Sequence, residues 1–252
     1  MPETSGNILL GPHPVPSKEG APTGVCIVIP VLNEEESIGG VIASIPGDLV
    51  SEIIVADGGS TDKTIEIASA HGARVLRAGK GYGRACLAGA LAADEACGII
   101  VTMDGDSSDV PEEIPKLIAP IAEGTCDFVI ASRARGFREP GSMAWHQLAS
   151  GWLIGLAVGL LYGFRYTDMC AFRAIRREAL MALGMREMTY GWNLEMQMKA
   201  ARHGLRILEI PVPYSKRAGG RSKVAGSFYG SLHAGSRILL TLGRVALRTK
   251  IG

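Results

Sequence analysis

From residue 25 onward, short β-branched runs alternate with longer amphipathic stretches. Nearly continuous apolar runs of this length predict strands buried on both faces, and the stretches between them predict helices. The alternation therefore predicts an α/β fold with a mostly parallel central sheet flanked by helices. The expected strands are residues 25–32, 52–57, 73–78, 98–104 and 127–132, and the expected helices are residues 35–44, 64–70, 82–96 and 112–121.

The flanking regions do not follow this pattern. Residues 1–24 are rich in proline and glycine and contain no apolar core of a secretory signal, so they are expected to form a flexible tail. Residues 140–165 include a continuous apolar part of about 14 residues. This is shorter than the roughly 20 residues that a membrane-spanning helix needs, and it predicts a buried or membrane-surface helix. Residues 226–252 are expected to form a C-terminal amphipathic helix.

Composition narrows the range of functions. The 252 residues are 47% hydrophobic, which is enough for one substantial core and favours a single catalytic domain over residues 25–225. Because 26 basic and 25 acidic side chains give a net charge of +1, no general attraction to nucleic acid is expected. The five cysteines are odd in number and contain no C-x-x-C pair, which disfavours a disulfide framework or zinc site and predicts a reduced, cytoplasmic protein.

Acidic side chains follow three of the predicted strands. The first strand leads into Asn33 and Glu34, the second ends at Asp57, and the fourth runs into Asp104 and Asp106. Ligands of parallel α/β sheets bind beyond the carboxyl ends of the strands, so these side chains are expected to lie at one site. The sequence therefore predicts an acidic site at this edge of the sheet.

Two common nucleotide-binding folds do not fit this pattern. A Rossmann domain or a P-loop nucleotidase needs a glycine-rich turn that holds phosphate at a helix N-terminus. Here the first strand leads into the acidic run 34–36, and no GxxxxGK[ST] motif occurs. The glycine-rich segment 79–83 follows the third strand and lacks the GxGxxG spacing. If the protein binds a nucleoside diphosphate, it is expected to do so through a cation.

Asp104 and Asp106 form an Asp-x-Asp motif after a buried strand. Mg2+ and Mn2+ bind carboxylate oxygens together with substrate phosphate oxygens, and Gly105 is expected to let the backbone bend so that both carboxylates converge. Asp109 has a different interpretation, because Pro111 follows it as in the first turn of a helix, and Asp109 is expected to cap that helix. On this interpretation Asp109→Ala costs about 1 kcal/mol of stability and little activity.

Several motifs occur in order along the chain: P-V-L-N-E at 30–34, D-G-G-S-T-D at 57–62, G-x-G-x-A at 81–85, M-D-x-D at 103–106 and S-R at 132–133. Together they resemble the family 2 inverting glycosyltransferases of GT-A fold. The segments T-D-M-C-A-F-R at 167–173 and R-x-G-G-x-S-K at 217–223 are similar to dolichol-phosphate mannose synthases and bacterial polyprenyl-phosphate glycosyltransferases. The resemblance covers about residues 25–225.

The resemblance implies a GDP- or UDP-hexose donor, Mg2+ or Mn2+, and transfer with inversion. Ser108 stands where the family often has a glutamine ligand. The expected nucleotide-binding residues are Pro30, Leu32, Glu34, Asp57, Lys80 and Asp104, the expected metal ligands are Asp104, Asp106 and Ser108, and the expected phosphate or acceptor ligands are Arg133, Arg217, Ser222 and Lys223. The expected catalytic set is Asp104, Asp106, Asp168, Arg133 and Arg217.

The acceptor remains open at this stage. A polyprenyl phosphate needs fixed cations, such as Arg133, whereas a hydroxyl on a soluble sugar, small molecule or glycan needs a carboxylate base. Asp168 and Glu195 are candidates for that base, although Glu195 is alternatively expected to face water. A lipid acceptor is consistent with residues 140–165 lying on the cytoplasmic face of a membrane. A sugar-phosphate nucleotidyltransferase, a non-catalytic binding subunit and a homo-oligomer also stay open.

Overall fold

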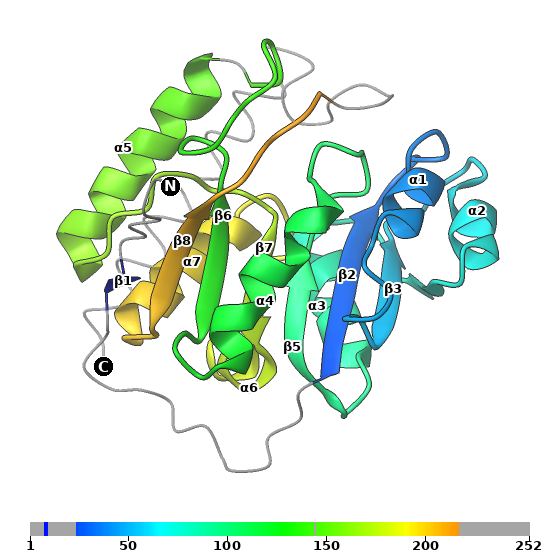
Figure 1. The fold of residues 1–252 in the computed structure, drawn as a ribbon, viewed down its shortest axis with the longest axis horizontal. Helices are drawn as coiled ribbons and strands as arrows, with labels where there is room; N and C mark the ends of the chain where they lie inside the picture. The colour runs from blue at the N-terminus through cyan, green and yellow to red at the C-terminus, as the bar shows by residue number, and fades with distance from the viewer. Residues whose placement is uncertain (1–7, 10–23, 144, 217–252) are drawn as a thin grey trace.

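A mixed β-sheet forms the centre of the structure, a computed structural model that describes residues 8–9, 24–143 and 145–216 (Figure 1). Within these residues the sheet has eight strands in the order β1-β8-β6-β7-β5-β2-β3-β4. The strands β5, β2, β3 and β4 run parallel, and β7 is antiparallel to both of its neighbours. The strands are β1 (Ile8–Leu9), β2 (Gly24–Val31), β3 (Glu52–Asp57), β4 (Arg74–Arg77), β5 (Cys97–Thr102), β6 (Phe128–Ser132), β7 (Arg173–Arg176) and β8 (Ile207–Pro211).

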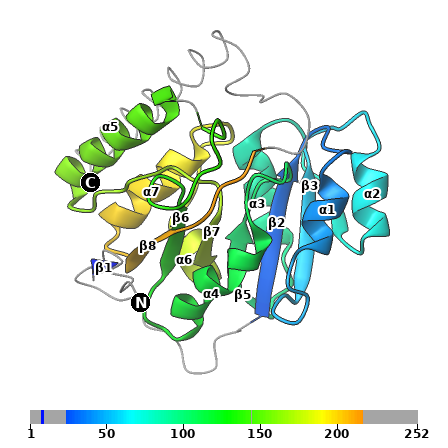
Figure 2. The ribbon, with the colours of Figure 1, turned by 45° about the horizontal axis from the view of Figure 1, so that its top comes forward.

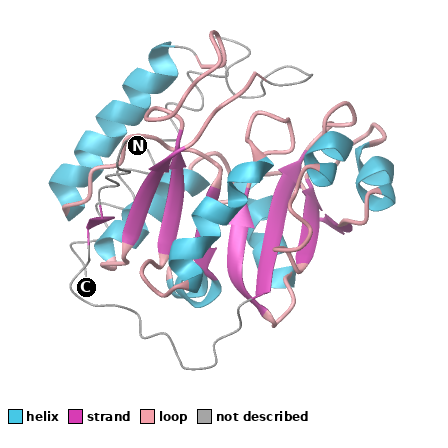
Figure 3. Cartoon of the chain, viewed as in Figure 1, coloured by secondary structure: helices cyan, strands magenta, loops and turns pink. Residues whose placement is uncertain are grey.

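Helices cover both faces of the sheet, as Figure 3 shows. Alternate residues of β2 point to opposite faces: Val28 packs with α3, α6 and α7, and Ile27 packs with α1, α2 and α4. Burial on both faces explains why the strands are continuously apolar rather than alternating. The helices are α1 (Ile38–Ala43), α2 (Thr64–Ala70), α3 (Tyr82–Ala92), α4 (Ile114–Ala122), α5 (Trp145–Tyr162), α6 (Arg177–Ala182) and α7 (Trp192–Arg202), and a 3-10 turn, η1, spans Pro111–Glu113.

The predicted α/β fold is confirmed. The strands and helices predicted between residues 25 and 132 are all present, those at 52–57 and 64–70 with the predicted bounds and the others with shifted ends. The helix expected at 35–44 begins at Ile38, and the helix expected at 82–96 ends at Ala92. The sequence did not predict β7 because its residues, R-A-I-R, carry charge at both ends, yet Arg173 is fully buried. Residues 8–9 pair with β8 and so belong to the sheet rather than to a flexible tail. The helix expected at 226–252 lies outside the described residues.

The helix α5 packs through glycines onto the extended segment 165–168. A Cβ added at Gly155 would lie 1.8 Å from the carbonyl oxygen of Tyr166, and one added at Gly151 would lie 3.9 Å from Cα of Asp168. Elsewhere on this helix large apolar side chains are open to solvent: Trp152 and Leu160 are exposed by 52% and 80%. Of the helices that the structure describes, none combines the length and the apolar character needed to cross a membrane.

We expect Gly155→Ala to destabilise the protein by about 1–3 kcal/mol, because the new methyl group overlaps the Tyr166 carbonyl and forces α5 away from the segment 165–168. A matched control is Gly40→Ala in α1, where an added Cβ meets no atom within 4 Å. Alanine is the better helix former by about 1 kcal/mol, so this control should be neutral or stabilising. Chemical denaturation measures both, and equal shifts in the two variants would contradict the packing role of Gly155.

Candidate active site

The loop that carries the Asp-x-Asp motif leaves β5 and packs across the end of β2; Figure 2 turns this edge of the sheet toward the viewer. The buried Ser37 hydroxyl donates to the Gly105 carbonyl at 2.8 Å. A Cβ at Gly105 would lie 2.9 Å from the Val31 side chain, and the left-handed residue of the loop is Ser107, with φ 65°. The expectation that Gly105 provides the bend is therefore wrong: this glycine permits close packing on β2.

Asp109 does not cap the following helix, as the sequence had predicted. The 3-10 turn begins after Val110, without a side-chain capping bond. The Asp109 carboxyl instead points back into the loop, where its Oδ2 accepts a hydrogen bond from the Asp104 amide at 2.9 Å. Burial, and then the negative charge of Asp104, raises the pKa of Asp109 to about 8. At neutral pH Asp109 is therefore mostly protonated, and it holds the backbone of a predicted metal ligand.

A cavity of about 500 Å³ opens at this edge of the sheet, within the size range of small-molecule sites. It brings together predicted residues from separate strand ends, namely Pro30, Leu32, Glu34, Lys80, Asp104, Asp106 and Arg133. It is also lined by residues that the sequence did not indicate as ligands, namely Tyr82, Met169, Ala171, Thr189, Tyr190 and Asn193. The predicted residues Arg217, Ser222 and Lys223 lie outside the described residues.

Two predicted ligands lie behind the cavity rather than in its lining. Asp57 is 2% exposed, and its carboxylate accepts hydrogen bonds from the amides of Gly59 and Ser60 at 3.0 and 2.9 Å. It therefore closes the turn after β3. Ser108 is fully buried; its amide donates to Asp106 Oδ1 at 2.9 Å, and its Oγ makes no hydrogen bond within the described residues.

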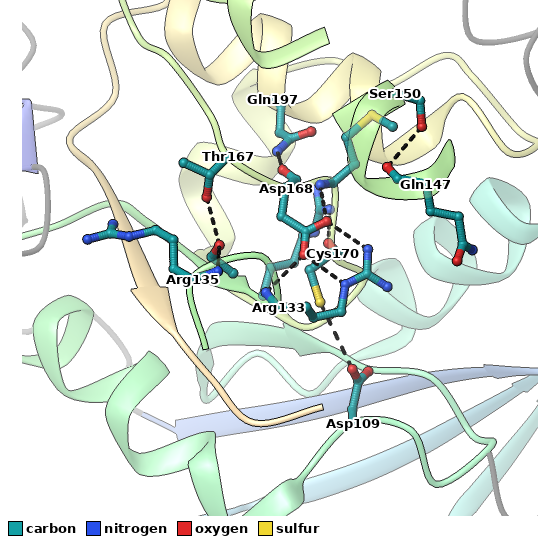
Figure 4. A network of polar contacts seen from close by, with 12 residues as sticks. Asp109, Arg133, Arg135, Gln147, Ser150, Thr167, Asp168, Cys170 and Gln197 are labelled. Atoms are coloured by element: carbon teal, nitrogen blue, oxygen red, sulfur yellow. Dashed lines mark hydrogen bonds and ion pairs between the residues drawn. The ribbon is translucent and has the colours of Figure 1, made fainter. Parts of the chain in front are cut away.

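Arg133 lines the cavity and is fixed from behind by Asp168 (Figure 4). The Arg133 Nε and Nη2 donate to the two Asp168 oxygens at 2.8 and 2.7 Å, and the Arg133 amide donates to Oδ2 at 2.9 Å. Burial alone would raise the pKa of Asp168, but the Arg133 guanidinium outweighs it, and the pKa lies below its usual value. A carboxylate held in this way is a weak base and a strong anchor.

The backbone around Asp168 is fixed as well. The Gln197 amide donates to the Asp168 carbonyl at 2.8 Å, and Glu209 accepts from the amides of Thr167 and Asp168 at 2.9 and 3.2 Å. Glu209 is 2% exposed and lies on β8. The second half of the chain thus contributes a rigid support for one cationic side chain of the cavity.

Glu195 does not face water, so that expectation is wrong. It is 4% exposed, and its Oε2 accepts from the amides of Arg186 and Glu187 at 2.9 and 2.7 Å while Oε1 pairs with Lys199 at 2.9 Å. Glu195 does not line the cavity. It fixes instead the start of the segment 186–193, which supplies the cavity wall with side chains that no local motif had indicated.

The residues present fit a hard divalent cation in their chemistry. Asp104 and Asp106, whose carboxylates are ligands of this kind, both line the cavity. Among the described residues, however, no group of three or more His, Cys, Asp or Glu side chains is arranged to hold an ion. Mg2+ commonly binds one or two carboxylates and completes its shell with water and substrate phosphate oxygens. These two aspartates therefore suit an ion that binds together with a diphosphate.

Comparison with known proteins gives a consistent result. The Glycosyl transferase family 2 model matches residues 26–184. An uncharacterized glycosyltransferase of Mycobacterium tuberculosis is 38% identical over 213 residues, covering 83% of this chain and 94% of that protein. The undecaprenyl-phosphate mannosyltransferase of Micrococcus luteus is 31% identical and covers 82% of this chain and 89% of its own length.

Solved structures show the same fold. Glucosyl-3-phosphoglycerate synthase of Mycobacterium tuberculosis, in complex with Mn2+, UDP and phosphoglyceric acid, superposes with a TM-score of 0.68 and 27% identity, covering 88% of this chain and 78% of that one. The same enzyme with Mg2+ and UDP gives the same TM-score and identity. The family model matches more than half of this chain, and the architecture agrees with that of the solved structures. The chain therefore belongs to glycosyltransferase family 2 and has the GT-A fold.

Proposed function

We propose that this glycosyltransferase moves a hexose, with inversion, from a UDP- or GDP-sugar to a polyprenyl phosphate with the help of Mg2+ or Mn2+. The observation that carries the proposal is that Asp104, Asp106 and a rigidly held Arg133 line one cavity. Complexes of a similar enzyme with Mn2+, Mg2+ and UDP support the donor and the ion. The name of the Micrococcus luteus relative, undecaprenyl-phosphate mannosyltransferase, supports the acceptor.

The donor is assigned to the end of the cavity formed by the β2 and β3 loops. Pro30, Leu32, Glu34 and Lys80 would contact the nucleoside and its phosphates, and Asp57 would keep the β3 turn in shape. Asp104 and Asp106 would hold the ion, with Ser108 behind them. When bound, the ion neutralises the charge of the nucleoside diphosphate as it leaves.

The acceptor is assigned from charge and proton chemistry. An oxygen of the acceptor phosphate attacks the anomeric carbon, and a new carbon–oxygen bond forms as the bond to the nucleoside diphosphate breaks. A phosphate monoester is already ionised near neutral pH and needs positioning rather than a base. Arg133 provides that positioning, with Arg217, Ser222 and Lys223 as further proposed ligands. Asp168 and Glu195, the candidate bases for a hydroxyl acceptor, accept hydrogen bonds from Arg133 and from backbone amides.

The lipid part of the acceptor is assigned to α5. This helix packs through Gly151 and Gly155 on the segment that ends in Asp168, and Asp168 holds Arg133 of the proposed phosphate site. Trp152 and Leu153 are exposed by 52% and 58%, and the Arg165 guanidinium lies 5.6 Å from the centre of the Trp152 ring. An apolar face with cationic side chains suits the boundary between lipid tails and anionic headgroups. We therefore propose a peripheral enzyme on the cytoplasmic face of a membrane.

The test is a panel of UDP- and GDP-hexoses incubated with Mn2+ and one of three acceptors: a polyprenyl phosphate in detergent, phosphoglycerate, or a free hexose. The expected result is transfer of one hexose to the polyprenyl phosphate. Phosphoglycerate is included because the similar solved structure binds phosphoglyceric acid. Transfer to phosphoglycerate or to the free hexose alone would overturn the lipid acceptor, and release of nucleoside diphosphate without any transfer would overturn the acceptor assignment as a whole.

Asp104→Asn is expected to lower kcat/KM by about 100-fold or more, the usual loss when a group that stabilises the leaving charge is removed. Thermal stability should change little, because Asn has the size and shape of Asp and the residue lines the cavity. Isothermal titration with UDP should show that Mn2+ tightens binding for the unmodified protein and not for the variant. Glu112→Gln is the control: it removes one negative charge, as Asp104→Asn does, but at an exposed position close to the same loop. This control should leave Mn2+-dependent UDP binding unchanged.

Asp109→Ala should destabilise the protein by about 1–3 kcal/mol, because the Asp104 amide loses its acceptor in a buried place. It should also lower activity, since the same bond positions Asp104. Asp109→Asn keeps an acceptor oxygen and, like the mostly protonated acid, is neutral at pH 7, so both properties should largely survive. Denaturation midpoints and kcat/KM for the two variants provide the check, and an equal loss in both would contradict this role for the Asp109 oxygen.

A further inference from the structure

Two polar side chains of the cavity wall have buried atoms without hydrogen bonds. The hydroxyl of Tyr82 and Oδ1 of Asn193 are shielded from solvent, and neither forms a hydrogen bond within the described residues. The Asn193 side chain lies near enough to lower the pKa of Tyr82, but the two side chains do not meet the geometry of a hydrogen bond. Both residues line the cavity. Buried polar groups without partners destabilise a fold, so these two point to a ligand that completes them.

Close packing of two distant segments brings this pair together. Tyr82 begins α3 between two glycines, and Asn193 is the second residue of α7. A Cβ at Gly81 would lie 2.5 Å from the Met188 carbonyl oxygen, and one at Gly83 would lie 2.4 Å from that of Glu187. The Arg84 amide donates to the Met188 carbonyl at 3.0 Å. The glycines therefore allow the segment 187–193 to lie flush against the start of α3.

The pair also lies near the predicted metal loop. Burial raises the pKa of Tyr82 well above its usual value, and the Cys86 thiol and the Asp104 carboxylate raise it further. Tyr82, Asn193, Asp104 and Arg133 belong to one cavity. A hexose joined to a diphosphate at Asp104 would thus have the phenol and the amide of this wall within reach, between the leaving group and the cation assigned to the acceptor.

We infer that Tyr82 and Asn193 form the subsite that recognises hydroxyl groups of the donor hexose and selects which hexose is transferred. The inference rests on the proposed function, because it needs a sugar nucleotide in the cavity. A hexose hydroxyl both donates and accepts a hydrogen bond; it can donate to Asn193 Oδ1 and accept from the Tyr82 hydroxyl, which stays protonated. A hexose whose hydroxyl points elsewhere leaves both groups unpaired, and sites of this kind discriminate strongly.

The test compares Tyr82→Phe with Tyr162→Phe. The Tyr162 hydroxyl is also buried without a hydrogen bond, but it lies on α5 outside the cavity lining. Each change removes an unpaired hydroxyl, so neither should lower the melting temperature. Isothermal titration in the presence of Mn2+ then measures the affinity for two ligands. One is the sugar nucleotide that the donor panel identifies as the substrate, and the other is its nucleoside diphosphate. Tyr82→Phe should weaken binding of the sugar nucleotide by at least about 10-fold and leave binding of the diphosphate unchanged. Tyr162→Phe should change neither affinity.

Asn193→Leu removes the amide while keeping a similar volume, and it should cause the same selective loss of sugar-nucleotide binding. In both cavity variants, the ratio of kcat/KM between sugar nucleotides that carry epimeric hexoses should fall. Unchanged sugar-nucleotide binding and an unchanged epimer ratio in Tyr82→Phe would overturn the subsite while leaving the proposed function intact. The subsite is likewise overturned if the unmodified protein binds the nucleoside diphosphate with Mn2+ and no attached hexose increases the affinity. If it binds neither, the proposed function itself fails.

Discussion

Hydrogen bonds from loop amides to buried carboxyl groups determine the shape of the functional edge of this protein. Asp57 closes the turn after β3, Asp106 and Asp109 hold the loop after β5, and Glu195 anchors the approach to α7. The Asp168 carboxylate holds Arg133 by accepting hydrogen bonds from the Arg133 amide and from the Arg133 guanidinium. Because a buried carboxylate without partners is costly, each of these bonds restricts its loop to a narrow set of conformations.

Rigid loops matter for the chemistry that the family performs. A glycosyltransferase must hold a leaving diphosphate, a sugar and an acceptor in line, and the rate depends on groups that are already in place when charge develops. The Arg133–Asp168 pair illustrates this, since the cation keeps one orientation toward the cavity before any acceptor arrives. In the same cavity the protein tolerates unpaired polar atoms on Tyr82 and Asn193, and this cost to stability becomes useful if a sugar supplies the missing partners.

The helix α5 joins the apolar surface of the protein to this edge. Its glycines press it against the backbone that leads into Asp168, while large apolar side chains elsewhere on the helix are exposed. Val158 is fully buried on the inner side, so the helix combines an ordinary core contact with glycines that let its backbone approach the neighbouring segment closely. The arrangement brings a lipid-compatible surface as near as the backbone allows to the site proposed for a phosphate.

Much of the fold and part of the site could be predicted from local sequence. Continuous apolar runs predicted the strands that carry Asp57, Asp104 and Arg133, because burial on both faces is a property of each run by itself. Since parallel strands end at one edge, the convergence of Glu34, Asp104 and Asp106 followed from the same pattern, whereas Pro30 and Arg133 were expected from the resemblance to the family. The strand β7 escaped prediction because its buried arginine is stabilised by carbonyl groups that lie elsewhere in the chain.

The partner of each polar group was decided by the tertiary structure. Asp109 has the sequence context of a helix cap, yet its carboxyl turns to the Asp104 amide; Glu195 has the context of a solvent-facing residue, yet it is buried under the segment 186–187. The position of Tyr82 and Asn193 in one cavity wall was not indicated by either local sequence, apart from two glycines beside Tyr82 whose close contacts depend on the segment that leads into α7. The sequence by itself determined which apolar runs are buried and which chemistry the strand ends carry, because these depend on nearest neighbours along the chain. Which groups meet depends on non-local packing, and only the folded molecule decides it.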